Sequence, residues 1–155
     1  EFSGLNMRSD ISAQTSVGSP TYDDFMDAWQ TLMEANVPDD NLSYIVCPRD
    51  AATLSKLTGA TTQEYLQPPR EVAAMTRLVS NSITRTQGGG GNESSAFVLD
   101  GRELLIGVRG APEISTTTDA SDAFTKHQVW IKCVWRIDFA VTRPSAIVRL
   151  SGITA

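Results

Sequence analysis

The chain has a single histidine, His127, and only two cysteines, Cys47 and Cys133, among its 155 residues. The two cysteines lie far apart and match no CxxC or zinc-ligand spacing, so the pattern supports neither a redox centre nor a metal site. A Ser-His-Asp or Cys-His centre would have to use His127, and no Gly-x-Ser-x-Gly motif accompanies it. We therefore predict no catalytic, metal-binding or cofactor-binding residues, and we interpret His127 as a surface or strand-edge side chain.

Long hydrophobic runs, a surplus of positive charge and an initiator methionine are also missing. The apolar runs are only a few residues long, which excludes a transmembrane helix and a membrane partner. Thirteen Lys and Arg residues stand against eighteen Asp and Glu, for a net charge of −5. An acidic chain repels phosphate groups, so we expect no dedicated nucleic-acid site. The chain starts at Glu1 without methionine, and we expect it to be a piece of a longer protein or to carry a cloning remnant.

Cys47 is the candidate nucleophile that the sequence offers. It ends a predicted strand just before a helix, a position where active sites often lie and where a helix N-terminus lowers a thiol pKa. Its neighbours Val46 and Pro48 instead favour a buried, unreactive thiol. A small thiol enzyme using Cys47 stays as an alternative from a different functional class.

Helical periodicity is clearest directly after a Ser-, Gly- and Thr-rich segment over residues 1–20, which we interpret as an extended arm or linker. Apolar side chains recur at spacings of three and four over 21–36, with Thr21 as a plausible N-cap and Asn36 as the stop. Short elements follow: a strand 43–47, a helix 51–57 capped by Asp50 and closed by Gly59, a helical turn 71–75 and a strand 77–83.

Asp100-Gly101 separates two apolar runs, Ser95–Leu99 and Glu103–Val108. An Asp-Gly pair between such runs is a strong β-hairpin signal, so we predict that these two strands pair with each other. A further short strand is expected over Glu113–Thr116. The order of helix, strand, helix and then mostly strands indicates an α+β fold.

Four consecutive glycines, Gly88, Gly89, Gly90 and Gly91, form the most flexible segment of the sequence. A phosphate-binding loop would need a Gly-Lys-Ser/Thr and a following helix, and neither is present. Because ordering four glycines costs much conformational entropy, we predict a mobile surface loop.

Residues 129–141 alternate between apolar and other side chains over thirteen positions. This period of two predicts one long strand with a core-facing side that includes Cys133, and a mixed side with Lys132, Arg136 and Asp138. Pro144 ends the strand, and 146–150 forms a last one.

The stretch FTKHQVWIKCVWRIDFAVTRPSAIVRL, residues 124–150, resembles the closing signature of tailed-phage major capsid proteins. The matching positions are Phe124, a central Arg136 in the long strand, the pair Arg143-Pro144, and then an apolar strand. Upstream segments resemble the family in the same order, over about residues 21 to 150. The resemblance implies a Hong Kong 97-type capsid fold, of which this chain would be the C-terminal portion.

In that fold an axial lobe faces the centre of each capsomer, and a peripheral lobe carries a long spine helix. The resemblance implies that 21–38 and 124–143 are peripheral-lobe elements, the former as the spine helix. It implies that 41–123 and 144–155 form the axial lobe, with a mixed or antiparallel sheet and helices. The family's N-terminal arm and extended E-loop precede the spine helix, and residues 1–20 are too short to contain them.

The implied function is that of a major capsid subunit of a tailed phage or prophage, which is not an enzyme and needs no cofactor. Its implied partners are copies of itself in pentamers and hexamers, with scaffold, portal or decoration proteins as further candidates. The implied location is the virion, after assembly in the cytoplasm of a bacterial host. An encapsulin-type shell protein is the nearest alternative.

Overall fold

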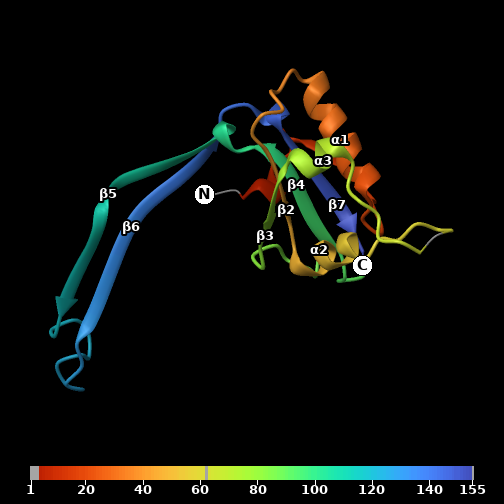
Figure 1. Ribbon diagram of the computed structural model, residues 1–155. Helices are drawn as coiled ribbons and strands as arrows, with labels where there is room; N and C mark the ends of the chain where they lie inside the picture. Colours follow the sequence, from red (N-terminus) through yellow and green to blue (C-terminus); the bar gives the residue numbers. More distant parts are fainter. Residues whose placement is uncertain (1–3, 62, 155) are drawn as a thin grey trace. The chain divides into compact units, whose positions relative to one another are not determined.

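Two units of different architecture make up the chain (Figure 1). The computed structural model describes residues 4–61 and 63–154. Leu104–Val141 forms the second unit, which we name the hairpin unit. The described residues before and after it form the first unit, which we name the sheet unit.

A five-stranded sheet in the order β1-β7-β4-β2-β3 organises the sheet unit. Its strands are β1 (Ser12–Gln14), β2 (Leu42–Val46), β3 (Thr76–Val79), β4 (Ser94–Asp100) and β7 (Ile147–Ile153). The inner pairs β7–β4 and β4–β2 are antiparallel, whereas the outer pairs β1–β7 and β2–β3 are parallel. All seven residues of the central strand β4 are buried, so its two faces are both covered.

Helix α1 (Tyr22–Glu34) covers one face of this sheet and contacts β4 and β7. Its buried residues Phe25, Ala28 and Leu32 recur at helical spacing and join the core formed by the sheet. The carboxylate of Asp24 accepts hydrogen bonds from the backbone N–H and the hydroxyl of Thr21, both at 2.7 Å, which fixes the helix start. The predicted helix and its N-cap are therefore confirmed.

Short helices connect the strands of the sheet unit. They are α2 (Pro48–Ser55), α3 (Arg70–Ala74) and the 3₁₀ turns η1 (Leu5–Met7), η2 (Gly101–Glu103) and η3 (Pro144–Ala146). On the sheet face opposite α1, Ser95 and Arg149 both hydrogen-bond Asn6, which lies in η1. The N-terminal segment, predicted as an arm, thus contributes strand β1 to the sheet edge and polar contacts to its second face.

The hairpin unit consists of two long antiparallel strands, β5 (Leu104–Thr117) and β6 (Trp130–Val141), which pair along their whole length. The pairing starts at Leu104 opposite Val141 and ends at Thr117 opposite Trp130. Residues 118–129 form the tip loop between the strands.

The predicted hairpin about Asp100-Gly101 is wrong. Strand β4 pairs with β2 and β7, whereas β5 pairs with β6. Gly101 lies in η2, and the buried carboxylate of Asp100 accepts bonds from Arg102 instead of closing a two-residue turn. The expected short strand Glu113–Thr116 is the continuation of β5.

The predicted start of the second helix is also wrong, by three residues. Helix α2 begins at Pro48, a residue suited to the first helical turn, and its N-cap is Cys47. Asp50 therefore lies inside the first turn, where it is completely buried, and the helix ends before Lys56 rather than at Gly59.

The division into axial and peripheral lobes concerns a whole capsid subunit and stays a prediction. In the structure, helix α1 packs in the same unit as β2, β4 and β7, although the predicted division separates residues 21–38 from 41–123. The hairpin unit contains both β5 and β6, although the predicted division places residues 41–123 and 124–143 in different lobes.

Candidate assembly surface

One face of the β5–β6 ribbon is apolar along almost its whole length. Cross-strand partners in a sheet lie on the same face, and the face alternates along each strand. The register therefore places the following residues together: Leu104, Ile106, Val108 and Ile114 of β5, and Ile131, Cys133, Trp135, Ile137, Phe139 and Val141 of β6. We name this set the apolar ribbon face.

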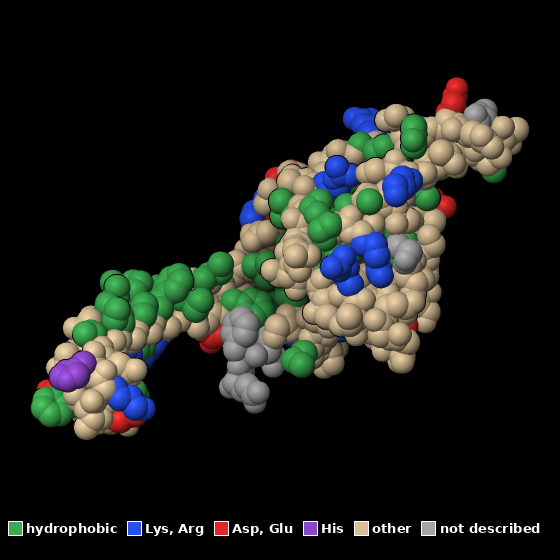
Figure 2. All heavy atoms as spheres, turned by 90° about the horizontal axis from the view of Figure 1, so that it is seen from below, with side chains coloured by type: hydrophobic (Ala, Val, Ile, Leu, Met, Phe, Trp, Pro, Cys, Tyr) green, Lys and Arg blue, Asp and Glu red, His purple; other side chains and the backbone are tan. Residues whose placement is uncertain are grey.

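The apolar ribbon face is open rather than buried. Ile106, Ile114 and Ile131 expose 76%, 70% and 72% of their surface. Figure 2 shows the hydrophobic side chains gathered along this part of the molecule. Cys133 is exposed as well, so the prediction that it lies in the core is wrong. The alternation correctly identified an amphipathic strand, but a two-stranded ribbon has no second layer to cover it.

The opposite ribbon face carries the charged side chains. The pairs Arg109–Arg136 and Gly107–Asp138 lie there, and Glu113 follows opposite Val134. Arg136, one of the family positions, is exposed on this polar face. The ribbon therefore has one apolar and one polar face. Antiparallel sheets that pack against other protein on one face only have the same division.

A bulge in β5 preserves this division of faces. Between Arg109 and Glu113 strand β5 advances by four residues, whereas β6 advances by two, from Arg136 to Val134. Two extra residues keep the parity of the alternation, so apolar side chains stay on the same face beyond the bulge. Gly110 adopts φ +75° here, a left-handed backbone conformation that glycine tolerates.

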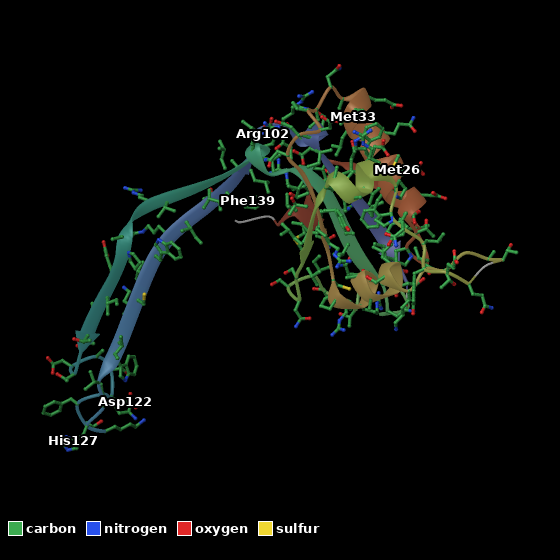
Figure 3. The ribbon with its side chains drawn as sticks, viewed as in Figure 1. Met26, Met33, Arg102, Asp122, His127 and Phe139 are labelled. Carbon is green, nitrogen blue, oxygen red and sulfur yellow. The ribbon has the colours of Figure 1, made fainter. Side chains whose placement is uncertain are left out.

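The tip loop holds Phe124 and His127 at the far end of the ribbon (Figure 3 labels His127 and Asp122). Phe124 exposes 74% of its surface. Within the loop an ion pair joins Lys126 to Asp122, and the side chain of Ala123 is buried. His127 is exposed with φ +49°, which confirms the prediction of a surface side chain.

The glycine segment forms a narrow turn on an anchored stem. Gln87 and Glu93 exchange backbone hydrogen bonds at 2.9 and 3.0 Å, and the N–H of Gly91 donates to the carbonyl of Gly88. The Glu93 carboxyl group lies over Gly88. A Cβ added at Gly88 would be 2.1 Å from the carboxyl carbon Cδ of Glu93. The predicted mobility of Gly88–Gly91 stays a prediction, while the stem beside it is held by hydrogen bonds.

A buried polar network at this stem escaped the sequence reasoning. The hydroxyl of Ser94 donates to the Asp50 carboxylate at 2.5 Å, and both side chains are buried. Arg49 donates to Asp50, to Ser94 and to the carbonyls of Asn92 and Ile153. The network thereby ties α2 to the ends of β4 and β7. In the sequence, Pro48-Arg49-Asp50 is the available signal of this network, but the pattern by itself predicts only the start of a helix.

The four family positions lie in different places. Phe124 and Arg136 belong to the hairpin unit, whereas Arg143 and Pro144 belong to the sheet unit. Pro144 begins the turn η3, and the guanidinium of Arg143 donates to the backbone carbonyls of Ala35 and Asn36. The structure therefore gives these positions separate roles and does not bring them together in one site.

Cys47 is completely buried, as the interpretation of an unreactive thiol predicted. Among residues 4–61 and 63–154, no group of three or more His, Cys, Asp or Glu side chains is arranged to hold a metal ion. No helix in the same part of the chain has the length and apolar character needed to cross a membrane.

Known structures share this fold. A solved structure from Mycobacterium phage Che8 matches with a TM-score of 0.63 and 16% identity, over 91% of this chain and 53% of the other. The capsid of a native GTA particle matches with a TM-score of 0.65 and 14% identity, over 94% and 50%. The encapsulin of Synechococcus elongatus matches with a TM-score of 0.57 and 11% identity, over 94% and 53%.

The chain thus spans about half the length of the solved structures that it resembles. No curated protein matches the sequence. The sequence model of the phage capsid family, in contrast, matches residues 4–152. This match includes the sheet, helix α1 and the whole β5–β6 ribbon, and the fold agrees with it. The chain therefore belongs to the phage capsid family.

Proposed function

We propose that the chain is part of a structural subunit that self-assembles into the icosahedral head of a tailed phage or prophage. Family membership supports a structural rather than a catalytic role. The observation that carries the proposal is the apolar ribbon face. Exposed apolar surface that is contiguous and bordered by polar groups marks a place where other protein packs.

The ribbon also needs a covering layer on energetic grounds. An isolated two-stranded hairpin is at best marginally stable in water, and ribbons gain stability when a third strand or another layer packs on their apolar side. In the assembled shell, other parts of the subunits cover the apolar ribbon face, and Cys133 becomes inaccessible. The polar face with Arg109 and Arg136 stays at a hydrated surface or a polar contact.

The two cysteines provide a direct test. We would treat the full-length gene product, before and after assembly, with iodoacetamide at neutral pH. We expect Cys133 to react quickly in free subunits and slowly in shells. Cys47 is protected in both states and serves as an internal reference, because it is buried in the sheet unit. Equal labelling of Cys133 in the two states would contradict burial of this face.

Electron microscopy of the same samples tests the assembly itself. Round, uniform shells would support the proposal, whereas soluble monomers from an intact gene would refute it. Fast labelling of Cys47 in the folded state would instead revive the thiol-enzyme alternative. We expect the 155-residue chain alone to form monomers or small oligomers, and closed shells from it would contradict this expectation.

Within the subunit we infer that the sheet unit, including helix α1, is the axial lobe. The packing of α1 on β4 and β7 supports this grouping, which revises the predicted place of residues 21–38. The ribbon then belongs to the peripheral lobe. Pentamers and hexamers of the full subunit are the proposed assemblies, in the virion and, during assembly, in the cytoplasm of a bacterial host. Scaffold, portal and decoration proteins are candidate further partners.

An encapsulin-type shell is a second candidate, because the encapsulin of Synechococcus elongatus shares the fold. The two functions differ in what the shell encloses. Nuclease-protected DNA in purified particles would support a phage head. Particles that contain a co-purifying protein and no DNA would support a compartment.

A further inference from the structure

The connection between α1 and β2, residues 35–41, is bound by two arginines of the sheet unit that flank the hairpin unit in sequence. Arg102 lies two residues before β5, and Arg143 lies two residues after β6 (Figure 3 labels Arg102). The two arginines are 41 positions apart in sequence, yet both bind this one connection. All of these residues belong to the sheet unit.

Arg143 binds the C-terminal end of helix α1. The helix ends with Asn36 in a left-handed conformation at φ +55°, and the N–H of Val37 bonds back to the carbonyl of Leu32. The carbonyls of Ala35 and Asn36 then accept hydrogen bonds from the Arg143 guanidinium. The last turn of α1 contains no basic residue of its own, so Arg143 supplies the cation that the helix dipole favours there.

Arg102 binds the other end of the same connection. Its guanidinium lies 2.7 Å from the Asp40 carboxylate and 2.8 Å from the Asp100 carboxylate. Asp100 is almost completely buried, whereas Asp40 is exposed. Asn41 donates a further bond to Asp100 at 3.4 Å. Arg102 also holds the pKa of Asp100 below its usual range, mainly because its side chain donates hydrogen bonds to the Asp100 carboxylate. Asp100 therefore stays ionised and paired at neutral pH.

The two sheet-unit residues that flank the hairpin unit are also bonded to each other. The backbone N–H and the hydroxyl of Thr142 both donate to the carbonyl of Glu103, each at 3.0 Å. Glu103 directly precedes β5, and Thr142 directly follows β6. The base of the hairpin is therefore closed by its own backbone and held at two points on residues 35–41.

We propose that Arg102 and Arg143 are positioning residues that form a two-point clamp, which makes Glu103 and Thr142, the sheet-unit residues that flank the hairpin unit, move as one body with the end of helix α1. Neither arginine acts only locally, because each holds a different end of a seven-residue connection. Loosening one end frees the connection, and the other end loses its fixed partner.

The two halves of the clamp differ in their sensitivity to salt. The Arg102–Asp40 pair is exposed, and at 1 M salt the screening length falls to about 3 Å. Of the Arg143 contacts, the bond to the Ala35 carbonyl is partly buried, where screening is weaker, whereas the bond to the Asn36 carbonyl is exposed. Salt should therefore weaken the contact at Arg102 first, and because the two ends are coupled, exchange at Asn36 and Val37 should then rise as well.

Hydrogen exchange of the unassembled chain tests the clamp independently of the assembly proposal. In Arg143→Gln we expect the amides of Asn36 and Val37 to exchange about tenfold faster. The coupling that defines the clamp appears at the other end: the Arg102 amide, bonded to Asp100, should also exchange faster. Arg102→Gln should in turn speed exchange at Asn36 and Val37.

Arg85→Gln is the matched control, because Arg85 is exposed and its side chain makes no hydrogen bond or ion pair with the part of the chain that the structure describes. It should leave all of these amides unchanged. Arg143→Lys keeps the charge without the planar fork, so we expect partial rescue at Asn36. The unmodified chain in 1 M NaCl gives a further measurement that needs no variant to fold.

Coupled exchange at both ends in either variant would support the clamp, as would salt-induced exchange that begins at Arg102 and extends to Asn36 and Val37. Changes confined to the amides next to the substituted arginine would overturn it, since they would show two independent local contacts. Unchanged exchange in both Gln variants would overturn it as well.

Discussion

Ile131 offers a sharp test of the apolar ribbon face, because its role in the free chain and in an assembly should differ. It lies on β6 opposite Thr116 and exposes 72% of its surface. Its neighbour Lys132 points to the opposite face of the same strand. Ile131→Ser therefore changes the apolar face, and Lys132→Ser is the matched control on the polar face.

The size of the effect follows from the exposed fraction. Complete burial of an isoleucine side chain is worth about 1.5–3 kcal/mol, so covering the exposed 72% is worth about 1–2 kcal/mol for each subunit. That corresponds to about a 5- to 30-fold weaker association for each contact. In the free chain only about a quarter of the side chain is buried, so the cost to folding stays below about 1 kcal/mol.

Two measurements separate these effects. Light scattering of the full-length subunit gives the concentration at which shells form, and circular dichroism gives the melting temperature of the chain. We expect Ile131→Ser to raise the assembly concentration, with a melting temperature lowered by less than about 4 °C. Lys132→Ser should change neither. Equal effects of the two substitutions on assembly would refute the assignment of faces, as would an unchanged assembly concentration in Ile131→Ser.

Three further outcomes follow from the sheet unit. Leu32→Ala should cost about 2–5 kcal/mol in urea unfolding, because Leu32 is completely buried under the sheet; a cost below 1 kcal/mol would contradict this packing. Gly152→Ala should lower the melting temperature, because Gly152 has φ +73° and a Cβ would lie 3.0 Å from the Cα of Ser16; an unchanged value would contradict the close approach. The depressed pKa of Asp100 means that its pairing with Arg102 stabilises the fold fully above about pH 4 and is lost as pH falls through the lowered pKa. The stability difference between wild type and Asp100→Asn should therefore shrink in acid, and a constant difference down to pH 2 would contradict the pairing.

Local sequence rules identified most elements of the sheet unit correctly. The stripe with Phe25 and Leu32 and the N-cap Thr21 define α1 because capping and helical periodicity act within a few residues. The rules failed where a distant contact decides the local structure. Asp100-Gly101 has the composition of a two-residue turn, but Arg102 binds the carboxylates of both Asp100 and the distant Asp40, and Gly101 lies in the 3₁₀ turn η2.

The clamp and the Asp50 network show why sites are harder to predict than elements. Arg143 binds the carbonyl of Ala35, 108 residues earlier, and Ser94 bonds a carboxylate 44 residues earlier. No periodicity or spacing rule connects such pairs, because the partners meet only after the sheet has formed. A family signature marks Arg143 as a fixed position, yet only the structure gives a physical reason for it.

The unexpected exposure of Cys133 says more about assembly than the correctly predicted helices and strands do. A period of two shows that one strand face avoids water, but it does not say which protein surface removes that face from water. In a chain whose own sheet buries the strand, Cys133 and Ile131 would be core. Here β6 has only β5 beside it, and the apolar side chains on both strands stay exposed. The sequence of β6 thus has the alternation of a buried strand, although the described part of the chain leaves its apolar side chains exposed. This is the pattern expected of a strand that other parts of the assembled subunits cover.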